Sequence, residues 1–161
     1  MKNLSMRTNE WLTEQLAMLW YRYFDDIDQP NDVVIKFGQP AITRLGSIKW
    51  GRKPLRQQSG ALERRSIITI TSHLKDPKIP DEVVLGVMAH ELVHYAHGFS
   101  SPRPQLYKHP HHGGVVDREL AKRGLGAVLK FQENWLKKHW TDYVRANHKV
   151  KRSLYGKLSF L

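Results

Sequence analysis

The sequence predicts an α+β domain in which a small, mostly antiparallel three-stranded sheet packs against a long helix and further flanking helices. Three observations lead to this prediction. The chain of 161 residues, 40% of them hydrophobic, suits one compact domain with its own core. Apolar residues recur at helical spacing near the start of the chain and again beyond residue 81. Three short segments rich in β-branched residues, which favour strands, lie between these regions.

The first half of the chain supplies one helix and the three strands. Apolar residues between Asn9 and Phe24 follow a helical period, and Thr8 or Asn9 can cap the helix that this period predicts. The polar, glycine-bearing residues before and including Gly60 indicate a hairpin-like connection ahead of the third strand. We expect the strands at 33–37, 44–50 and 66–71.

The second half is helical, and its first helix is unusually apolar. Asp81 stands where an N-cap residue is expected, and the helix is predicted from Val83 to His97, with Gly98 as the residue that ends it. Nearly every position on it other than histidine is apolar, so the helix is expected to be buried, and its polar residues require a function. Further helices are predicted over 113–124 and 127–146, after a proline-containing loop at 98–112.

Composition excludes several classes of chemistry. The chain has no cysteine, which rules out disulfides, thiolate nucleophiles and cysteine zinc ribbons, so any metal must be bound by histidine and carboxylate. No apolar run reaches the roughly 18 residues of a membrane span, and the first residues lack the apolar region of a signal peptide. We therefore expect a cytoplasmic protein without a membrane partner, with association with DNA or the nucleoid as a further expectation.

The chain is strongly basic, which favours an acidic partner such as nucleic acid. Lysine and arginine number 26 against 15 acidic residues, a net charge of +11. The excess lies in two segments, 44–65 and 130–157. In the first, Arg52, Lys53 and Arg56 lie close to Trp50, a combination that suits contacts to single-stranded or junction DNA. In the second, the helical spacing of Trp135, Trp140 and Tyr143 favours a role in the core.

The buried helix carries His90-Glu91-Leu92-Val93-His94, the HExxH pattern of metallopeptidases. Residues four apart lie on one helix face, so the two imidazoles can bind one zinc ion. Glu91 projects to the side of that face, where it can act as general base on a zinc-activated water.

A catalytic zinc needs a third protein ligand, and the residues alone leave it open. His97 lies seven residues after His90, about 10.5 Å along the helix, which is too far. Further along the chain, His109, His111, His112 and Glu119 compete for the role.

The sequence resembles the SprT-like zinc metallopeptidases, the family of the DNA–protein crosslink protease Spartan. Besides HExxH, the residues that carry the resemblance are Arg44-Leu45-Gly46, Ile67–Thr71 with Ser72-His73-Leu74, and His112-Gly113-Gly114-Val115-Val116 before Leu120 and Gly124. Val116 stands where the family usually has Phe or Trp. The resemblance implies a zincin-like fold over 1–126, followed at 127–161 by a C-terminal helix and a basic tail that lacks the family's zinc ribbon.

The resemblance also implies a site and a function. His90, His94 and His112 become the zinc ligands and Glu91 the general base of a zinc-dependent endopeptidase that is associated with DNA. Glu119 or His111 as third ligand remains an alternative. The alternative functions are a regulatory metallopeptidase of one specific protein, with a glutamate ligand, and a non-catalytic nucleic-acid-binding module.

Three further expectations concern the surroundings of the site. A substrate strand is expected to pair with an edge of the sheet near Ile67–Thr71. The oxyanion stabiliser is sought among Tyr95, Tyr107, His109 and Tyr143. The tail at 148–161 mixes basic and apolar residues and is expected to lie in the cleft as an inhibitor.

Overall fold

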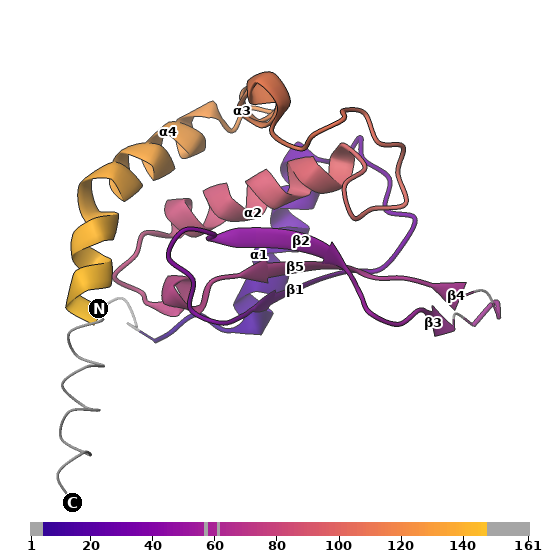
Figure 1. The fold of residues 1–161 in the computed structure, drawn as a ribbon, viewed down its shortest axis with the longest axis horizontal. Coiled ribbons are helices and arrows are strands. Elements are labelled where there is room, and N and C mark those ends of the chain that lie inside the picture. Colours follow the sequence, from indigo (N-terminus) through magenta and orange to yellow (C-terminus); the bar gives the residue numbers. More distant parts are fainter. Residues whose placement is uncertain (1–4, 57, 61, 148–161) are drawn as a thin grey trace, which may run out of the picture.

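A computed structural model of the chain describes residues 5–56, 58–60 and 62–147. They form the expected α+β arrangement of one helix, a small sheet and further helices (Figure 1). The helices are α1 (Asn9–Tyr23), α2 (Asp81–Ala96), α3 (Val115–Lys122) and α4 (Gly126–Trp135), and the strands are β1 (Val33–Phe37), β2 (Gly46–Trp50), β3 (Leu55–Arg56), β4 (Leu62–Glu63) and β5 (Ser66–Ile70). Short 3₁₀ turns occupy Ser72–Lys75 and His112–Gly114, and a π-helical turn at Leu136–Trp140 extends α4.

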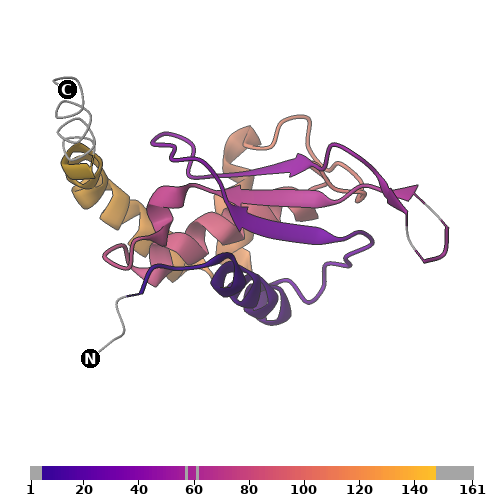
Figure 2. The ribbon, with the colours of Figure 1, turned by 90° about the horizontal axis from the view of Figure 1, so that it is seen from below.

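The main sheet is mixed, with the strand order β1-β5-β2 (Figure 2). β1 pairs with β5 in parallel, with Val33 opposite Ser66, whereas β2 pairs with β5 antiparallel, with Gly46 opposite Ile70. The expectation of a mostly antiparallel sheet is therefore only half right. β5 is the central strand, so the expected free edge near Ile67–Thr71 is wrong, and the edge strand beside α2 is β2.

The strands β3 and β4 form a separate hairpin that extends beyond the main sheet (Figure 1). Leu55 pairs with Glu63 and Arg56 with Leu62, which agrees with the hairpin-like connection expected from the sequence. Both leucines are largely exposed, so the hairpin contributes little to the core.

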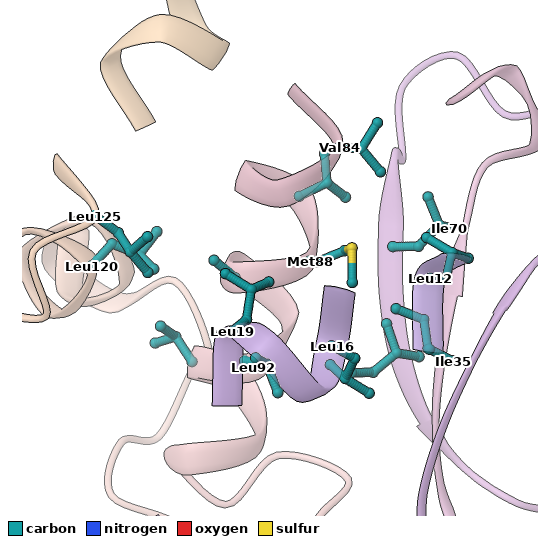
Figure 3. Close-up of a cluster of buried hydrophobic side chains, with 14 of the residues drawn as sticks. Leu12, Leu16, Leu19, Ile35, Ile70, Val84, Met88, Leu92, Leu120 and Leu125 are labelled. Carbon is teal, nitrogen blue, oxygen red and sulfur yellow. The ribbon is translucent and has the colours of Figure 1, made fainter. Parts of the chain in front are cut away.

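One face of the main sheet holds the core. Along β5, Ser66, Ile68 and Ile70 are buried, while Ile67 and Thr69 are only partly covered, so β5 has one fully buried face. Figure 3 shows side chains of the core from α1, α2, the sheet, α3 and the residue before α4: Leu12, Leu16, Leu19, Val84, Met88, Leu92, Ile35, Ile70, Leu120 and Leu125. Leu120 and Leu125 lie on the side of α2 away from the sheet.

Helix α2 begins two residues before the predicted start and ends one residue before the predicted end, with His97 as its C-cap residue. Asp81 and Glu82 lie in its first turn, Pro80 takes the N-cap position, and Arg7 forms an ion pair with Asp81. At the other end Gly98 has φ +84° and donates its N–H to the Tyr95 carbonyl at 3.0 Å. A Cβ atom on Gly98 would lie 2.3 Å from the Pro104 carbonyl oxygen, so both conformation and space require glycine.

The helical region after α3 packs on the rest of the fold. α4 crosses α2 at Gly86, where a Cβ atom would lie 2.2 Å from Oε1 of Gln132. Trp135, Trp140 and Tyr143 pack against the core, which confirms their expected role. The division of the chain at residue 126 remains a prediction, and the tail expected to act as an inhibitor, 148–161, lies outside the described residues. Within the described part, no helix has the length and apolar character needed to cross a membrane.

Candidate metal centre

Three histidine side chains converge at the C-terminal half of α2. Nε2 of His90 lies 3.0 Å from Nε2 of His111, and Nε2 of His94 lies 3.1 Å from the same atom. One ligand atom from each residue falls within 4.8 Å of the other two. The expected pairing of His90 and His94 on one helix face is thus observed, and His111 completes a cluster able to hold a metal ion.

The donor set fits a tetrahedral zinc ion. Zn–N bonds of 2.0–2.1 Å place neighbouring ligand nitrogens about 3.3–3.4 Å apart, close to the separations of His111 from the other two nitrogens. Burial is the first cause that lowers the pKa of His90 to about 4 and that of His94 to about 3, and the neighbouring imidazoles add to the effect. Both rings are therefore neutral near pH 7, the form that binds a metal.

The third member of the cluster is His111, which differs from the expected ligand His112. His112 is exposed and begins the 3₁₀ turn that leads into α3. Gly113 and Gly114 both have positive φ, 55° and 71°, and turn the chain away from the loop into the helix. The reversal begins two residues after His111, and His111 itself lies beside α2, against His90 and His94. The sequence offered His111 only as an alternative, because spacing alone does not locate the reversal.

The carboxylate alternative, Glu119, lies in an ion-pair network outside the cluster of His90, His94 and His111. Nε of Arg123 donates to Oε1 of Glu119 at 2.9 Å, and the same guanidinium binds Asp26 and the Tyr23 carbonyl. Glu119 therefore joins α3 to the end of α1. His97 is also outside the cluster, as its spacing predicted, and packs edge-on against the Tyr107 ring.

Glu91 lies beside the cluster in a mostly apolar setting. Its side chain is 5% exposed, and this burial raises its pKa to about 8, an effect that the Arg44 guanidinium opposes. A Cβ atom added to Gly46 would lie 2.7 Å from Oε1 of Glu91 and 2.8 Å from Cγ1 of Val87. The glycine at the start of β2 therefore allows the carboxylate to approach the strand backbone.

A cavity of about 600 Å³ joins these groups. His90, Glu91, His94 and His111 contribute to its wall on one side, and β2 with the residues just before it forms the other. The remaining lining residues include four that the sequence did not identify as part of the site: Arg44, Phe99, Ser100 and Gln132. They come from separate segments of the chain, and their spacing along the sequence does not indicate that they share a cavity. The sequence indicated Arg44 only as part of the family resemblance and of a basic segment, not as a site residue.

The expected oxyanion stabilisers do not line this cavity. Tyr95 is fully buried and donates its hydroxyl to Oδ1 of Asn31, and burial raises its pKa to about 12. The hydroxyl of Tyr143 donates to Oδ2 of Asp76 at 2.9 Å. Tyr107 packs against His97, and His109 lies in the same loop outside the cavity lining.

The residues expected to contact DNA lie around the β3–β4 hairpin. Arg52, Lys53 and Arg56 are exposed, and their side chains have no ion-pair or hydrogen-bond partner among the described residues. Trp50 is half-buried, and the Arg64 guanidinium lies 5.6 Å from its ring centre. That face of Trp50 is therefore already occupied, which argues against base stacking there.

Gly46 offers a test of the close approach between β2 and Glu91. Gly46→Ala is expected to displace the Glu91 side chain and to destabilise the fold by about 1–3 kcal/mol through overpacking. Urea unfolding measures the loss of stability, and zinc content is expected to be unchanged because the histidines are not touched. Gly51→Ala is the matched control, since its nearest neighbour would be at 3.5 Å. Equal stability of the two variants would contradict the prediction.

No family model, curated protein or solved structure matches the chain. The fold and site therefore define the protein only as an α+β domain with a three-histidine cluster suited to a metal ion.

Proposed function

We propose that the protein is a zinc-dependent endopeptidase of the SprT-like type. The observation that carries this proposal is the position of Glu91, a buried carboxylate between the histidine cluster and the edge strand β2. A purely structural metal site needs neither a neighbouring carboxylate outside the ligand set nor an adjoining cavity.

His90, His94 and His111 would hold the zinc ion. When bound, zinc supplies Lewis acidity, which polarises a peptide carbonyl and lowers the pKa of water and of the nearby Glu91 carboxyl. The carboxylate of Glu91 then takes a proton from the attacking water and later donates it to the amine that leaves.

The edge of β2 suits an extended peptide. Leu45 accepts a hydrogen bond from Thr71, and Gly51 donates one to Arg65, so the odd-numbered residues of this segment pair with β5. The backbone groups of Gly46, Ile48 and Trp50 consequently face away from β5. Ser100, which lines the cavity, donates its hydroxyl to the Ile48 carbonyl at 3.3 Å. A substrate strand added at this edge would pass Glu91 at the position of Gly46.

Removal of the metal tests the proposal directly. Protein purified without added metal is expected to contain close to one zinc per chain and to cleave unfolded protein substrates. Dialysis against a chelator is expected to abolish cleavage, and one equivalent of zinc to restore it. Mass spectrometry of the fragments distinguishes internal cleavage from trimming of the ends. Zinc-loaded protein that cleaves no peptide bond would favour the alternative of a binding module.

The exposed cations in and just before the β3–β4 hairpin favour a second function, DNA binding. The hairpin extends beyond the main sheet (Figure 1). Arg52, Lys53 and Arg56, which lie in it or just before it, are exposed and do not line the cavity, so they can approach phosphates without obstructing it. We propose DNA as the partner, bound through its phosphates and without base stacking on the face of Trp50 that Arg64 covers.

Salt dependence of binding tests this second function. The triple variant Arg52→Gln, Lys53→Gln, Arg56→Gln is expected to bind DNA more weakly and with a flatter log–log salt slope, by about 0.7–0.9 for each lost phosphate contact. Fluorescence anisotropy with labelled oligonucleotides measures both. Zinc content serves as the control and is expected to be unchanged. The same slope in the variant would exclude the hairpin as the DNA contact.

A further inference from the structure

The cavity beside the histidine cluster has two chemically different ends. β2 runs along α2 so that Gly46 lies next to Val87 and Glu91, whereas Ile48 meets Ser100, which follows the end of α2. The end beyond Ile48 is lined by Phe99 and Ser100. At the opposite end, before Gly46, the lining residues are Thr43 and Arg44 with Gln132 from α4.

Arg44 is an exposed cation in the lining of the cavity. It is exposed and forms no hydrogen bond or ion pair with any described residue, although it lies near enough to Glu91 to influence that carboxyl. Arg123, by contrast, is satisfied by Asp26 and Glu119. Arg44 therefore remains available to a ligand in the cavity.

The segment that carries Arg44 is anchored on both sides. Nε1 of Trp140 donates to the Ile42 carbonyl at 3.0 Å, and the Thr71 hydroxyl bonds both the N–H and the carbonyl of Ala41. After Arg44, the Leu45 carbonyl accepts the Thr71 N–H. Ordering this segment on substrate binding therefore costs little entropy, which favours a specific subsite.

The charge of the cavity favours an anionic substrate group. Its lining contains the cations Arg44 and Lys49 but only one carboxylate, Glu91. The Gln132 amide, at the Arg44 end, adds a neutral hydrogen-bond donor. A guanidinium binds a carboxylate through two parallel hydrogen bonds.

We propose that Arg44, assisted by Gln132, forms a subsite that holds a carboxylate of the substrate close to the scissile bond. This inference rests on the proposed peptidase function and specifies its substrate class as acidic peptides. The carboxylate belongs either to an Asp or Glu side chain or to the carboxyl terminus of the peptide. A substrate strand paired along β2 would pass Glu91 at Gly46, which places the cleaved bond there. Arg44 lies two residues before Gly46, so the subsite would take a substrate residue within two positions of that bond.

The test compares quenched fluorescent peptides that differ only in Glu or Gln at each position around the cleavage site, with both termini blocked. The wild type is expected to prefer Glu at one position by roughly tenfold in kcat/KM. Arg44→Gln is expected to reduce that ratio to about one, and Arg44→Lys to give an intermediate ratio. Taking the ratio within each variant cancels any effect of Arg44 on Glu91. Arg22→Gln, the same change at an exposed arginine outside the cavity, is expected to retain the wild-type ratio.

A second arm identifies the source of the carboxylate, with peptides that carry a free carboxyl terminus and no acidic side chain. If the wild type prefers these peptides and Arg44→Gln abolishes the preference, the subsite is supported, and the carboxylate that it binds is the carboxyl terminus of the peptide. An unchanged Glu/Gln ratio in Arg44→Gln overturns the inference. If the wild-type protein cleaves none of the peptides, the peptidase proposal fails on its own. Binding of the same peptides to zinc-loaded Glu91→Gln protein requires no turnover, so it still decides whether Arg44 selects a carboxylate.

Discussion

Glu91→Gln is expected to lower peptide hydrolysis by roughly 10²- to 10⁴-fold, the contribution that a positioned general acid–base group makes to turnover. The amide retains the size of the carboxyl but can neither accept the proton of water nor return one to the leaving amine. Because Glu91 is 5% exposed and is not one of the three clustered imidazoles, the fold and the zinc content are expected to persist. Single-turnover rates on a quenched peptide, with elemental analysis of the same sample, measure both properties.

The control for this variant is Ser47→Ala, which removes a polar side chain from the lining of the same cavity without touching proton transfer or the proposed subsite. It is expected to retain far more activity than Glu91→Gln. Wild-type turnover in Glu91→Gln protein would contradict the mechanism even if zinc is bound, and simultaneous loss of zinc would instead make Glu91 a metal ligand.

The parts of the fold that local sequence determines could be predicted. The helical period of α1, the apolar body of α2 with Gly98 at its end, and the β-branched run of β5 each act within a few residues. Strand pairing could not be predicted in the same way. Whether β1 pairs with β5 in parallel depends on where the strand β2 and the β3–β4 hairpin, which lie between them in the sequence, are placed. That placement depends on packing against α2, which the composition of a single strand does not reveal.

In the candidate site too, the residues on one element could be predicted from the sequence, and those brought together from separate elements could not. His90, Glu91 and His94 share one helix, so their spacing alone predicts their geometry. Arg44 and Gln132 reach the cavity from a loop and from α4, and only the close packing of α4 on Gly86 brings them together. The third histidine depends on the backbone reversal at Gly113 and Gly114, which the sequence Gly-Gly permits without fixing which neighbouring histidine it favours.

His111→Ala is expected to weaken zinc binding by more than the roughly 10- to 100-fold loss that follows removal of an outer-sphere partner. Its Nε2 lies 3.0 Å from that of His90 and 3.1 Å from that of His94, so its removal leaves two protein ligands on one helix turn. Competition with a zinc chelator of known affinity measures the loss. Because His111 is exposed in a loop, thermal unfolding of the metal-free protein is expected to be unchanged.

The neighbouring residues supply matched controls for this variant. His112→Ala makes the same chemical change one residue further along, outside the cluster, and is expected to retain zinc affinity close to the wild type. Glu119→Ala is expected to destabilise the junction of α3 and α1, because Arg123 loses a partner, without loss of zinc. A larger loss of zinc in His112→Ala would restore the ligand that the family resemblance implies, and a larger loss in Glu119→Ala would place the protein among zinc peptidases with a glutamate ligand. Either result would mean that the chain after Pro110 rearranges when the metal binds, since His111 is the residue that forms the cluster with His90 and His94 among the described residues.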